Sequence, residues 1–460
     1  MKTLSRVAVP LLLSLTGPAA AQTSAPVEPP AEVRTPDLAN AVRTEFLRSW
    51  HAYEQYAWGH DELQPLSKTP RDWYGESLLM TPVDSLDTLL LMGLDDEAKK
   101  ARTLIDEKLS FDKDIPVKNF EVTIRLLGGL LSGYQMTGDP RLLELARDLG
   151  QRLLSAFNSP TGMPYMYVNL KTGKTSGARS NPAEIGTLLL EFGTLSKLTG
   201  NPVFYDKAKN ALLQLAKRRS KIGLVGEEID VETGRWISRA SHVGGGIDSY
   251  YEYLLKCSLL FGDKDCARLW KESAGALNKH LADTVPSGFW YGQVDMDSGQ
   301  RTATEFGALH AFLPAVLAHG GDFGRARRLQ DSAYKMWLQN GVEPELIDYR
   351  AMKVIAPGYP LRPEIIESAY YLYRYTRDPK YLNMGDTFFK GLLANCRADA
   401  GFTVLKDVRT NERGDLMPSY FLAETLKYLY LLFAPESTLD FKQVIFNTEA
   451  HPLRRTWKKK

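Results

Sequence analysis

The sequence has little cysteine and little net charge, and both shortages exclude classes of protein. Its 460 residues contain three cysteines, Cys257, Cys266 and Cys396, which are too few for a disulfide scaffold and show no zinc-binding spacing. In an exported chain one pair could be oxidised, leaving one thiol, and the sequence leaves the pairing open. The formal net charge of +2 offers no extended positive field, so nucleic acid is not an expected partner.

Long apolar runs are also scarce, because no stretch after the N-terminus is long and apolar enough to cross a membrane. At the N-terminus, a basic start precedes the apolar residues 7–15, and three alanines stand before Gln22. This pattern predicts a bacterial-style signal peptide over residues 1–21, so we expect a periplasmic or secreted protein. Residues 22–36 are rich in Pro, Ala, Ser and Glu, which predicts a flexible linker.

The rest of the chain has a globular composition and is organised by a repeated turn. Apolar residues make up 44% of the sequence, enough for one large domain, expected over residues 37–453 and followed by a basic, solvated tail at 454–460. The turn recurs with glycine at positions 138, 200, 262 and 321 and with Arg377 in the fifth place, so its spacing is 62, 62, 59 and 56 residues. Glycine suits the left-handed residue that ends a helix, and the Asp or Asn that follows suits the cap of the next helix.

Each turn separates two kinds of helix. The helix before it is apolar on all sides, as in residues 185–198 and 365–375, and the helix after it is amphipathic, as in 142–156 and 204–217. A helix that is apolar all round belongs inside, and its amphipathic partner belongs outside. Units of about 60 residues that pair an inner with an outer helix predict an all-α barrel with about seven inner helices; an open solenoid is the alternative.

Acidic residues stand at or near the predicted start of the inner helices. In a barrel of alternating helices all inner helices point the same way, so their N-termini meet at one mouth. The helix macrodipole favours acids at such places, but buried acids beside apolar residues are costly unless they bind cations, sugars or each other. We therefore expect a ring of carboxylates around one cavity. The acids are Asp84, Asp87, Glu121, Glu184, Asp248, Glu305, Glu364, Glu367 and Glu424.

Paired carboxylates are what the cleavage of a glycosidic bond requires. One acid protonates the leaving oxygen, while another activates water or attacks the anomeric carbon. Aromatic rings near the same mouth could stack on sugar faces, although a core role fits each of them equally well. The aromatic candidates are Phe120, Trp290, Tyr291 and Tyr420.

At these segments the sequence resembles glycoside hydrolase family 47, the class I α-1,2-mannosidases. The matching stretches run in family order from about residue 40 to 453. They are residues 84–89, 120–131, 248–256, 361–364, 421–433 and 446–452. Six matches in order make the resemblance specific, and together with the signal peptide pattern they indicate a bacterial member of the family.

The resemblance implies an (α/α)7 barrel plugged at one end by a C-terminal hairpin. It also implies an inverting exo-α-1,2-mannosidase that hydrolyses terminal α-1,2-linked mannose from oligosaccharides or glycans. In that enzyme Glu121 is the general acid, acting through a water, with Arg125 orienting it, and Glu364 is the base that activates the attacking water. Asp248 is the other catalytic carboxylate. Inversion requires the acid and the base to stand far enough apart to leave room for that water.

The same resemblance implies the metal site and the substrate contacts. Ca²⁺ is held by the hydroxyl and carbonyl oxygens of Thr448, with carboxylates reaching it largely through water, which suits a hard cation. The 2- and 3-hydroxyls of the sugar complete the shell of the ion in the family. Glu184 faces the leaving sugar. The implied substrate-binding residues are Arg125, Glu184, Arg362, Glu367, Tyr420 and Glu424.

Three positions depart from the family pattern. Gly246, two residues before the catalytic Asp248, replaces an arginine that holds the leaving-side glycan in the endoplasmic-reticulum type enzymes. Tyr420 replaces a phenylalanine that packs on the bound mannose, so the ring is kept and a hydroxyl is added. The inner helix expected to begin at Glu305 matches the family poorly. These changes keep the pocket for the cleaved mannose and leave the branch preference open.

Two other interpretations fit part of the pattern. A catalytically silent, mannoside-binding lectin has no need of an acid and a base, so the presence of Glu121, Asp248 and Glu364 argues against it. A sugar epimerase or polysaccharide lyase built on an α/α toroid would rely on His or Tyr, but the seven histidines avoid the inner-helix starts. The nearest, His242, is interpreted as a loop residue. We expect the protein to be a monomer.

Overall fold

The structure, a computed structural model, describes residues 35–455. The predicted signal peptide (1–21) lies outside these residues, as do nearly all of the predicted linker and the last five residues of the basic tail (456–460). Helix α1 (Thr35–Ala57) begins two residues inside the predicted linker. Between residues 35 and 455, no helix combines the length and the apolarity needed to cross a bilayer.

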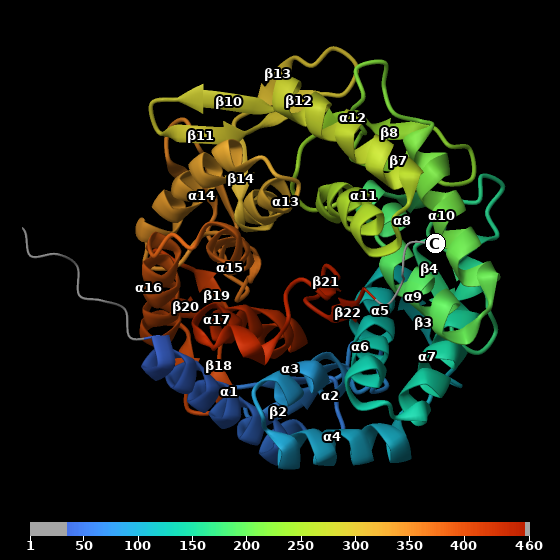
Figure 1. Cartoon of the computed structure of the whole chain (residues 1–460), viewed down its shortest axis with the longest axis vertical. Helices are drawn as coiled ribbons and strands as arrows, with labels where there is room; N and C mark the ends of the chain where they lie inside the picture. Colours follow the sequence, from blue (N-terminus) through green and yellow to red (C-terminus); the bar gives the residue numbers. More distant parts are fainter. Residues whose placement is uncertain (1–34, 456–460) are drawn as a thin grey trace, which may run out of the picture. The chain divides into compact units, whose positions relative to one another are not determined.

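Two concentric rings of helices form a barrel, in which outer and inner helices alternate along the chain (Figure 1). The outer helices are α1, α4 (Asp95–Lys108), α7 (Pro140–Leu153), α10 (Pro202–Ala216), α12 (Lys264–His280), α14 (Phe323–Leu338) and α16 (Lys380–Asn395). The described chain has seven inner segments, several of them built from consecutive pieces. They are α2 (Met80–Asp84) with α3 (Leu86–Leu91); α5 (Asn119–Val122), η1 (Thr123–Leu127) and α6 (Gly128–Thr137); α8 (Pro182–Gly186) with α9 (Leu189–Thr199); α11 (Asp248–Phe261); η3 (Ala308–Phe312) with α13 (Leu313–His319); α15 (Glu364–Thr376); and η4 (Phe421–Thr425) with α17 (Leu426–Phe433). The predicted (α/α)7 barrel is confirmed.

Burial separates the two rings as the apolar patterns predict. The outer helix α4 buries Ala98, Ala101 and Ile105 along one face and exposes most of its charged residues. The inner helix α11 buries ten of its 14 residues. Inner helices are therefore held by contacts on all sides, whereas each outer helix packs on the barrel through a single stripe.

The repeated turn connects each inner helix to the next outer helix. Gly138, Gly200 and Gly262 follow inner helices with φ angles of 73°, 72° and 68°, a left-handed conformation that costs glycine nothing sterically. Arg377 adopts the same conformation, with φ 58°. The predicted caps each accept a backbone N–H from the first turn of the outer helix; they are Asp139, Asn201, Asp263 and Asp322.

The opposite connections, from an outer helix to the next inner helix, are long and carry short antiparallel strands. Two additional short helices, η2 (Leu154–Phe157) and η5 (Glu436–Thr438), follow α7 and α17. In the part of the chain that the structure describes, the strands form nine small sheets: β1 (Glu62–Gln64) with β2 (Thr69–Arg71); β3 (Pro116–Lys118), β4 (Tyr167–Asn169) and β5 (Thr175–Ser176); β6 (Arg179–Ser180), β7 (Glu228–Asp230) and β8 (Trp236–Ser238); β9 (Ala240–Ser241), β12 (Gln293–Asp295) and β13 (Arg301–Ala303); β10 (Ala282–Val285) with β11 (Gly288–Tyr291); β14 (Glu305–Gly307), β15 (Leu346–Asp348) and β16 (Lys353–Ala356); β17 (Arg397–Ala398) with β18 (Gly401–Phe402); β19 (Leu405–Asp407) with β20 (Glu412–Arg413); and β21 (Val444–Phe446) with β22 (Pro452–Arg454). Strands β1 to β20 therefore gather on the face where the inner helices begin.

One predicted helix start was wrong. Glu305 begins strand β14, whose residues pair with β15, and the inner segment becomes helical only at Ala308. The strand partner, Leu346–Asp348, lies about 40 positions further along the chain, so the local apolar pattern could not reveal the pairing. Asp84 also differs slightly from prediction, because it is the last residue of α2 rather than an opening residue.

A C-terminal hairpin, β21 and β22, lies inside the ring of inner helices (Figure 1). In the loop between its strands, Asn447 Nδ2 donates to the Ile124 carbonyl (2.9 Å) and to Glu191 Oε1 (2.8 Å). The loop approaches α6 closely, because a β-carbon on Gly128 would lie 2.6 Å from Asn447 Nδ2. Strand β22 extends to Arg454, just beyond the predicted end of the domain.

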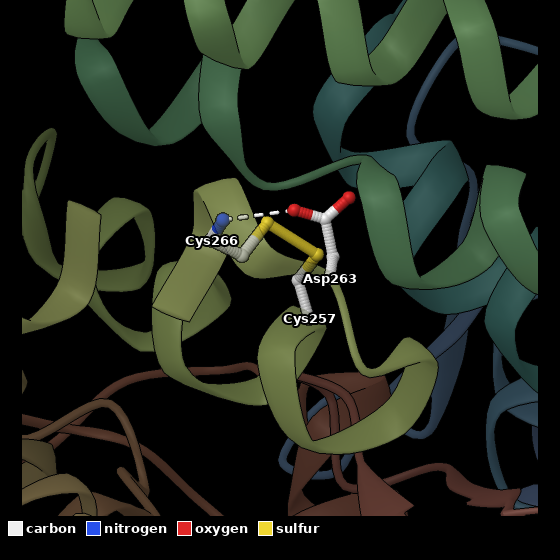
Figure 2. Close-up of side chains that lie close together, drawn as sticks. All are labelled: Cys257, Asp263 and Cys266. Atoms are coloured by element: carbon white, nitrogen blue, oxygen red, sulfur yellow. Dashed lines mark hydrogen bonds between the residues drawn. A yellow bond between two sulfur atoms is a disulfide. The ribbon is translucent and has the colours of Figure 1, made fainter. Parts of the chain in front are cut away.

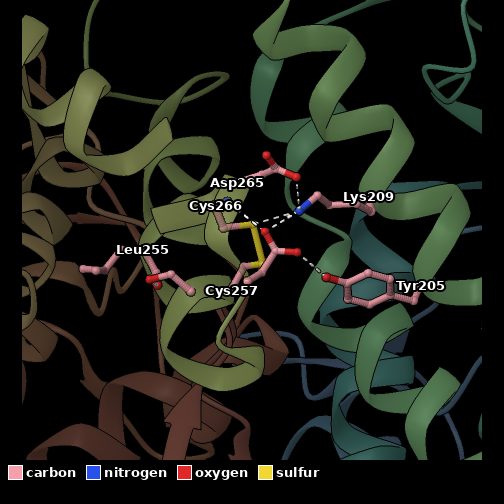
Figure 3. Close-up of a disulfide and its surroundings, with 8 residues drawn as sticks. Tyr205, Lys209, Leu255, Cys257, Asp265 and Cys266 are labelled. Carbon is pink, nitrogen blue, oxygen red and sulfur yellow. Dashed lines mark hydrogen bonds and ion pairs between the residues drawn. A yellow bond between two sulfur atoms is a disulfide. The ribbon is translucent and has the colours of Figure 1, made fainter. Parts of the chain in front are cut away.

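A disulfide joins Cys257 in α11 to Cys266 in α12 (Figure 2). Cys396 is a buried free thiol. Asp263 lies beside the two sulfurs, but oxidised sulfurs lack the thiolate charge that a metal ion requires, so this cluster is not a metal site. Lys209 and Tyr205 of α10 reach Asp263, the tyrosine hydroxyl donating at 2.5 Å. Figure 3 shows both side chains pointing toward the disulfide. The disulfide therefore lies within a polar junction of three helices.

Candidate active site

Six of the seven inner segments in the described chain surround, with their N-terminal ends, a cavity of about 320 Å³. All ten site residues predicted from the sequence line it: Glu121, Arg125, Glu184, Asp248, Arg362, Glu364, Glu367, Tyr420, Glu424 and Thr448. They come from five inner segments, counting the residues that directly precede them, and from the hairpin loop, which confirms that the inner helices share one mouth. Of the remaining predicted acids, Asp84, Asp87 and Glu305 do not line the cavity.

Glu121, on α5, is held between two cations. Arg125 lies one turn further on, and its Nε and Nη2 donate to Glu121 Oε2 at 3.2 and 3.0 Å. Lys118 Nζ lies 3.6 Å from the other oxygen, Oε1. The Arg125 guanidinium is itself placed over the rings of Trp73 and Tyr420, 5.2 and 5.4 Å from their centroids. The carboxylate of Glu121 thus has a defined orientation before any substrate binds.

Arg125 belongs to η1, a π-helical segment of the inner helix, and Glu424 belongs to the second such segment, η4. Single turns of π-helix in an α-helix shift the side chains that follow and often occur at functional sites. Arg125 is also paired with Glu449 of the hairpin loop. The two π-helical segments therefore aim an arginine and a carboxyl group at the same cavity.

Glu184 opens the next inner segment, α8. Asn181 caps this helix, and its Oδ1 accepts the Glu184 N–H at 2.9 Å. Lys118 Nζ contacts Glu184 Oε1 at 2.7 Å, while Oε2 is buried without a hydrogen-bond partner. Burial raises the pKa of Glu184 to about 7, although the Lys118 charge opposes this rise.

Asp248 and Glu364 stand at the starts of α11 and α15. Burial raises the pKa of Asp248 to about 6, and repulsion from Glu252 adds to the shift. Burial likewise raises the pKa of Glu364 to about 7, against the effect of the neighbouring Arg362 charge. Ser249 donates its N–H to Asp248 Oδ1 at 2.7 Å, whereas Glu364 Oε2 is buried without a partner. Both carboxyls can therefore exchange protons near neutral pH.

Glu367 and Glu424 complete the acidic wall. Burial raises the pKa of Glu367 to about 8 against the effect of the Lys256 charge 3.8 Å away, and Tyr428 donates its hydroxyl to Glu367 at 3.2 Å. Burial also raises the pKa of Glu424, and repulsion from Glu364 contributes. A cation bound among these carboxyls would reduce their mutual repulsion and favour their ionised state.

The residues present fit a hard divalent cation. Within residues 35–455, neither the hydroxyl nor the carbonyl oxygen of Thr448 takes part in a hydrogen bond, while its N–H donates to the Tyr253 hydroxyl at 3.3 Å. Thr448, with these two oxygens free, thus lines the same cavity as Glu364, whose Oε2 has no partner. An all-oxygen donor set with excess negative charge is what Ca²⁺ prefers.

The loop that presents Thr448 is anchored by a fully buried ionic cluster. His451 Nδ1 lies 2.7 Å from Asp87 and its Nε2 lies 3.1 Å from Asp84. Lys427 Nζ contacts Asp87 at 2.7 Å and donates to the Ala450 carbonyl at 2.7 Å. The acids Asp84 and Asp87, predicted to face the cavity, instead fix the hairpin to the inner helices.

Sequence reasoning missed several residues of the site and misplaced others. Lys118, Glu252 and Glu449 line the cavity but were not predicted. Glu252 and Glu449 lie inside the stretches that match the family, so listing every acid in those stretches could have identified them. No feature of the sequence distinguishes Lys118 in the same way. Of the two roles left open for the aromatic candidates, Trp290 and Tyr291 have the core role, because both lie on β11, are fully buried and do not line the cavity. Phe120 and Tyr420 do line it.

The fold and the site define an α/α-barrel glycoside hydrolase, with paired carboxyls in a pocket lined by oxygen atoms. Comparison with known sequences agrees: the model of Glycosyl hydrolase family 47 matches residues 45–455, and the chain belongs to this family. The protein is therefore an enzyme, and the catalytically silent lectin is set aside.

Individual relatives agree with the family assignment. Alpha-mannosidase I MNS5 of Arabidopsis thaliana is 38% identical over 92% of this chain and 78% of its own length. Mannosyl-oligosaccharide 1,2-alpha-mannosidase IB of Mus musculus is 35% identical over 92% of this chain and 71% of its own. The solved alpha-1,2-mannosidase from Trichoderma reesei superposes with a TM-score of 0.84 and 29% identity, covering 91% of this chain and 99% of that structure.

Proposed function

We propose that the protein is an inverting exo-α-1,2-mannosidase that releases terminal α-1,2-linked mannose from oligosaccharides or glycans with the assistance of Ca²⁺. The observation that carries this proposal is the convergence of Glu121, Asp248, Glu364 and Thr448 in one cavity. Its volume of about 320 Å³ suits a terminal sugar rather than a long chain threaded through the barrel. The names of the relatives supply the linkage and the sugar.

In this mechanism the carboxyl groups divide the proton transfers. Glu364, whose pKa is raised to about 7, accepts a proton from the water that attacks the anomeric carbon. Glu121, oriented by Arg125, delivers a proton to the leaving oxygen through a second water. Asp248 assists this exchange of protons from the start of α11. Because the water displaces the leaving oxygen in a single step and attacks from the opposite face of the sugar, the configuration at the anomeric carbon inverts.

Ca²⁺ would be held by the two free oxygens of Thr448, with Glu364, Glu367 and Glu424 reaching it through water. When bound, the ion supplies a Lewis acid that orients sugar hydroxyls and favours the ionised state of the surrounding carboxyls. Tyr420 places its ring at the same cavity, where it can pack on the sugar face.

Proton NMR of α-1,2-mannobiose incubated with the protein tests sugar, stereochemistry and cofactor together. We expect β-mannose to appear before the α-anomer, and release to stop when EDTA removes the calcium. First-formed α-mannose would contradict inversion, and unchanged release in EDTA would contradict the role of Ca²⁺. An absence of product with Ca²⁺ present would reject the mannosidase itself.

Export from a bacterial cell is a further part of the proposal. It rests on the signal peptide pattern and on the Cys257–Cys266 disulfide, since disulfides persist mainly in oxidising compartments. Expression of the full chain in a bacterium, with mass spectrometry of the N-terminus, tests it; we expect a product that begins at Gln22. We also propose a monomer, which light scattering checks.

A further inference from the structure

Lys118 is a cation inside the cavity to which the mechanism above gives no role. It is the last residue of β3 and directly precedes α5, which carries Glu121. Its backbone is fixed on both sides, because β3 pairs with β4 (Lys118 opposite Tyr167) and its N–H donates to the Tyr74 hydroxyl at 3.2 Å. A strand with little freedom to move therefore positions the Lys118 side chain at the cavity wall.

The ammonium group links two inner segments. Lys118 Nζ lies 2.7 Å from Glu184 Oε1 on α8 and 3.6 Å from Glu121 Oε1 on α5, and 5.9 Å from the centroid of the Phe120 ring. The Lys118 side chain is 31% exposed, whereas that of Glu184 is 6% exposed. Glu184 is thus buried in the cavity wall, whereas the Lys118 side chain is partly exposed and accessible to a bound sugar.

One carboxylate oxygen of Glu184 has no hydrogen-bond donor. Its Oε2 is buried and has no hydrogen-bond partner, whereas Oε1 is occupied by Lys118. A buried carboxylate oxygen without a donor is costly, so a ligand that brings a hydroxyl donor gains the interaction. A lysine ammonium has three donors, and two of them can serve Glu184 and Glu121. One donor of Lys118 and one acceptor of Glu184, members of the same ion pair, therefore remain unused, and a sugar ring with adjacent hydroxyl groups offers a partner to each.

The neighbouring backbone keeps this side open. Gly246, which lines the cavity, has φ +87°, a conformation that side-chain-bearing residues rarely adopt. Its carbonyl accepts the Ala183 N–H of α8 at 2.9 Å, so the glycine loop packs against the helix that carries Glu184. No side chain from position 246 competes with Lys118 for the approaching sugar.

We propose that Lys118 is a specificity-determining residue for the leaving sugar: with Glu184 it binds two adjacent hydroxyls of the residue beyond the cleaved mannose. Through its second contact it also keeps Glu121 beside the bond that breaks. This inference rests on the proposed function, because it assumes that a mannose occupies the cavity next to Glu121. It predicts that Lys118 acts on disaccharides and leaves the binding of free mannose unchanged.

The test compares wild type with Lys118→Met, which keeps the length of the side chain and removes its charge. Kinetics are measured on α-1,2-mannobiose, and affinities by calorimetry for free mannose and for the sulfur-linked disaccharide, which resists hydrolysis. We expect kcat/KM and the affinity for the thio-disaccharide to fall about 10- to 100-fold, as for the loss of a charge-assisted hydrogen bond. The affinity for mannose should stay within about twofold of wild type, and Lys118→Arg should restore most of the loss.

Lys113→Met is the matched control, since Lys113 pairs with Glu76 at 3.1 Å and does not line the cavity. If Lys118→Met does not fold, Glu184→Gln carries the same test and should show the same selective loss. Wild-type values for the thio-disaccharide, or an equal loss for mannose and disaccharide, would overturn the role of Lys118. A wild-type enzyme that neither binds nor cleaves the disaccharide would instead reject the proposed function.

Discussion

Individual carboxyl groups in this barrel have different roles because their surroundings differ. Glu364 has a buried oxygen with no partner and a pKa raised to about 7 by burial, so it can gain or lose a proton in the working range. Asp87 is fully buried as well, but Lys427 and His451 hold its pKa at about 2, so it stays ionised. The first environment suits proton transfer, and the second suits a structural anchor.

Glu364→Gln tests the proton-accepting role at this scale. The amide has the same shape and cannot take a proton from water, so we expect kcat on α-1,2-mannobiose to fall by about 10²- to 10⁴-fold. Calorimetry with the thio-disaccharide should still show binding. A variant that retains more than about a tenth of wild-type kcat would reassign the base.

Asp87→Asn tests the anchor by its pH dependence. Removing one member of a buried ionic cluster costs about 3–5 kcal/mol in the free energy of unfolding. The pKa of Asp87 is lowered to about 2, so its contribution is present above the unfolded value of about 4 and is lost as pH falls through about 2. The pKa of His451 is raised, so its contribution is full below about 6.5 and is lost as pH rises through the folded value.

The difference in unfolding free energy between wild type and Asp87→Asn should therefore be largest between about pH 4 and 6.5. Urea unfolding at a series of pH values measures it. A difference that stays constant from pH 3 to 9 would show that the ionic contacts of Asp87 do not stabilise the fold.

At the scale of elements, the close approach between helix α6 and the C-terminal hairpin depends on glycine. Gly128→Ala would place a β-carbon 2.6 Å from Asn447 Nδ2 and 2.9 Å from the His451 ring, so the loop that carries Thr448 would have to move. Gly275→Ala in α12 is the matched control, because nothing lies within 4 Å of that β-carbon. We expect a loss of about 1–3 kcal/mol for the first and a gain of up to about 1 kcal/mol for the second.

Thermal unfolding of the two alanine variants, measured side by side, checks this prediction. Gly128→Ala should also lower activity, because Thr448 lies one residue from Asn447. Equal melting temperatures for both variants would mean that the hairpin can move without a loss of stability.

The disulfide acts on the joint between α11 and α12, and α11 also carries Asp248 at its other end. Replacing Cys257 and Cys266 by alanine opens a loop of about ten residues, for which loop-closure entropy predicts a loss of about 2–3 kcal/mol. Denaturant unfolding of this double variant measures the loss. Cys396→Ala is the control for removing a buried thiol, and kcat should change little in the double variant because the cavity is remote from the sulfurs.

The cavity lies where six inner segments and the hairpin loop meet, so a bound ion would tie distant parts of the chain together. Ca²⁺ that binds only the folded state adds stability according to its concentration, about 2.7 kcal/mol at 100 times its dissociation constant. We expect the melting temperature to rise by a few degrees with Ca²⁺ and to return with EDTA, with Mg²⁺ as the control. Thr448→Val should abolish the rise. A melting temperature that does not change with Ca²⁺ would contradict a stabilising role of the ion.

Much of the molecule was predictable because its signals are local. The turns at Gly138, Gly200 and Gly262 depend on the conformational freedom of single residues and on caps one position away. Arg125, Arg362 and Thr448 were predicted from the family resemblance. The alternation of apolar and amphipathic helices predicted a barrel, and the direction of the inner helices predicted that the acids at their starts meet, as six of the nine do at the cavity. These inferences need only helical periodicity and chain direction.

Other features depend on contacts between residues far apart in the sequence. Glu305 lies in a strand because its segment pairs with Leu346–Asp348. Asp84 and Asp87 do not line the cavity, because they form ion pairs with His451 and Lys427 instead. Lys118 entered the site because strand pairing fixes its backbone beside Glu184. The sequence alone thus determined the barrel, its mouth and its principal acids. Only the tertiary structure decided which charges meet, because an ion pair depends on distance in space and not on spacing along the chain.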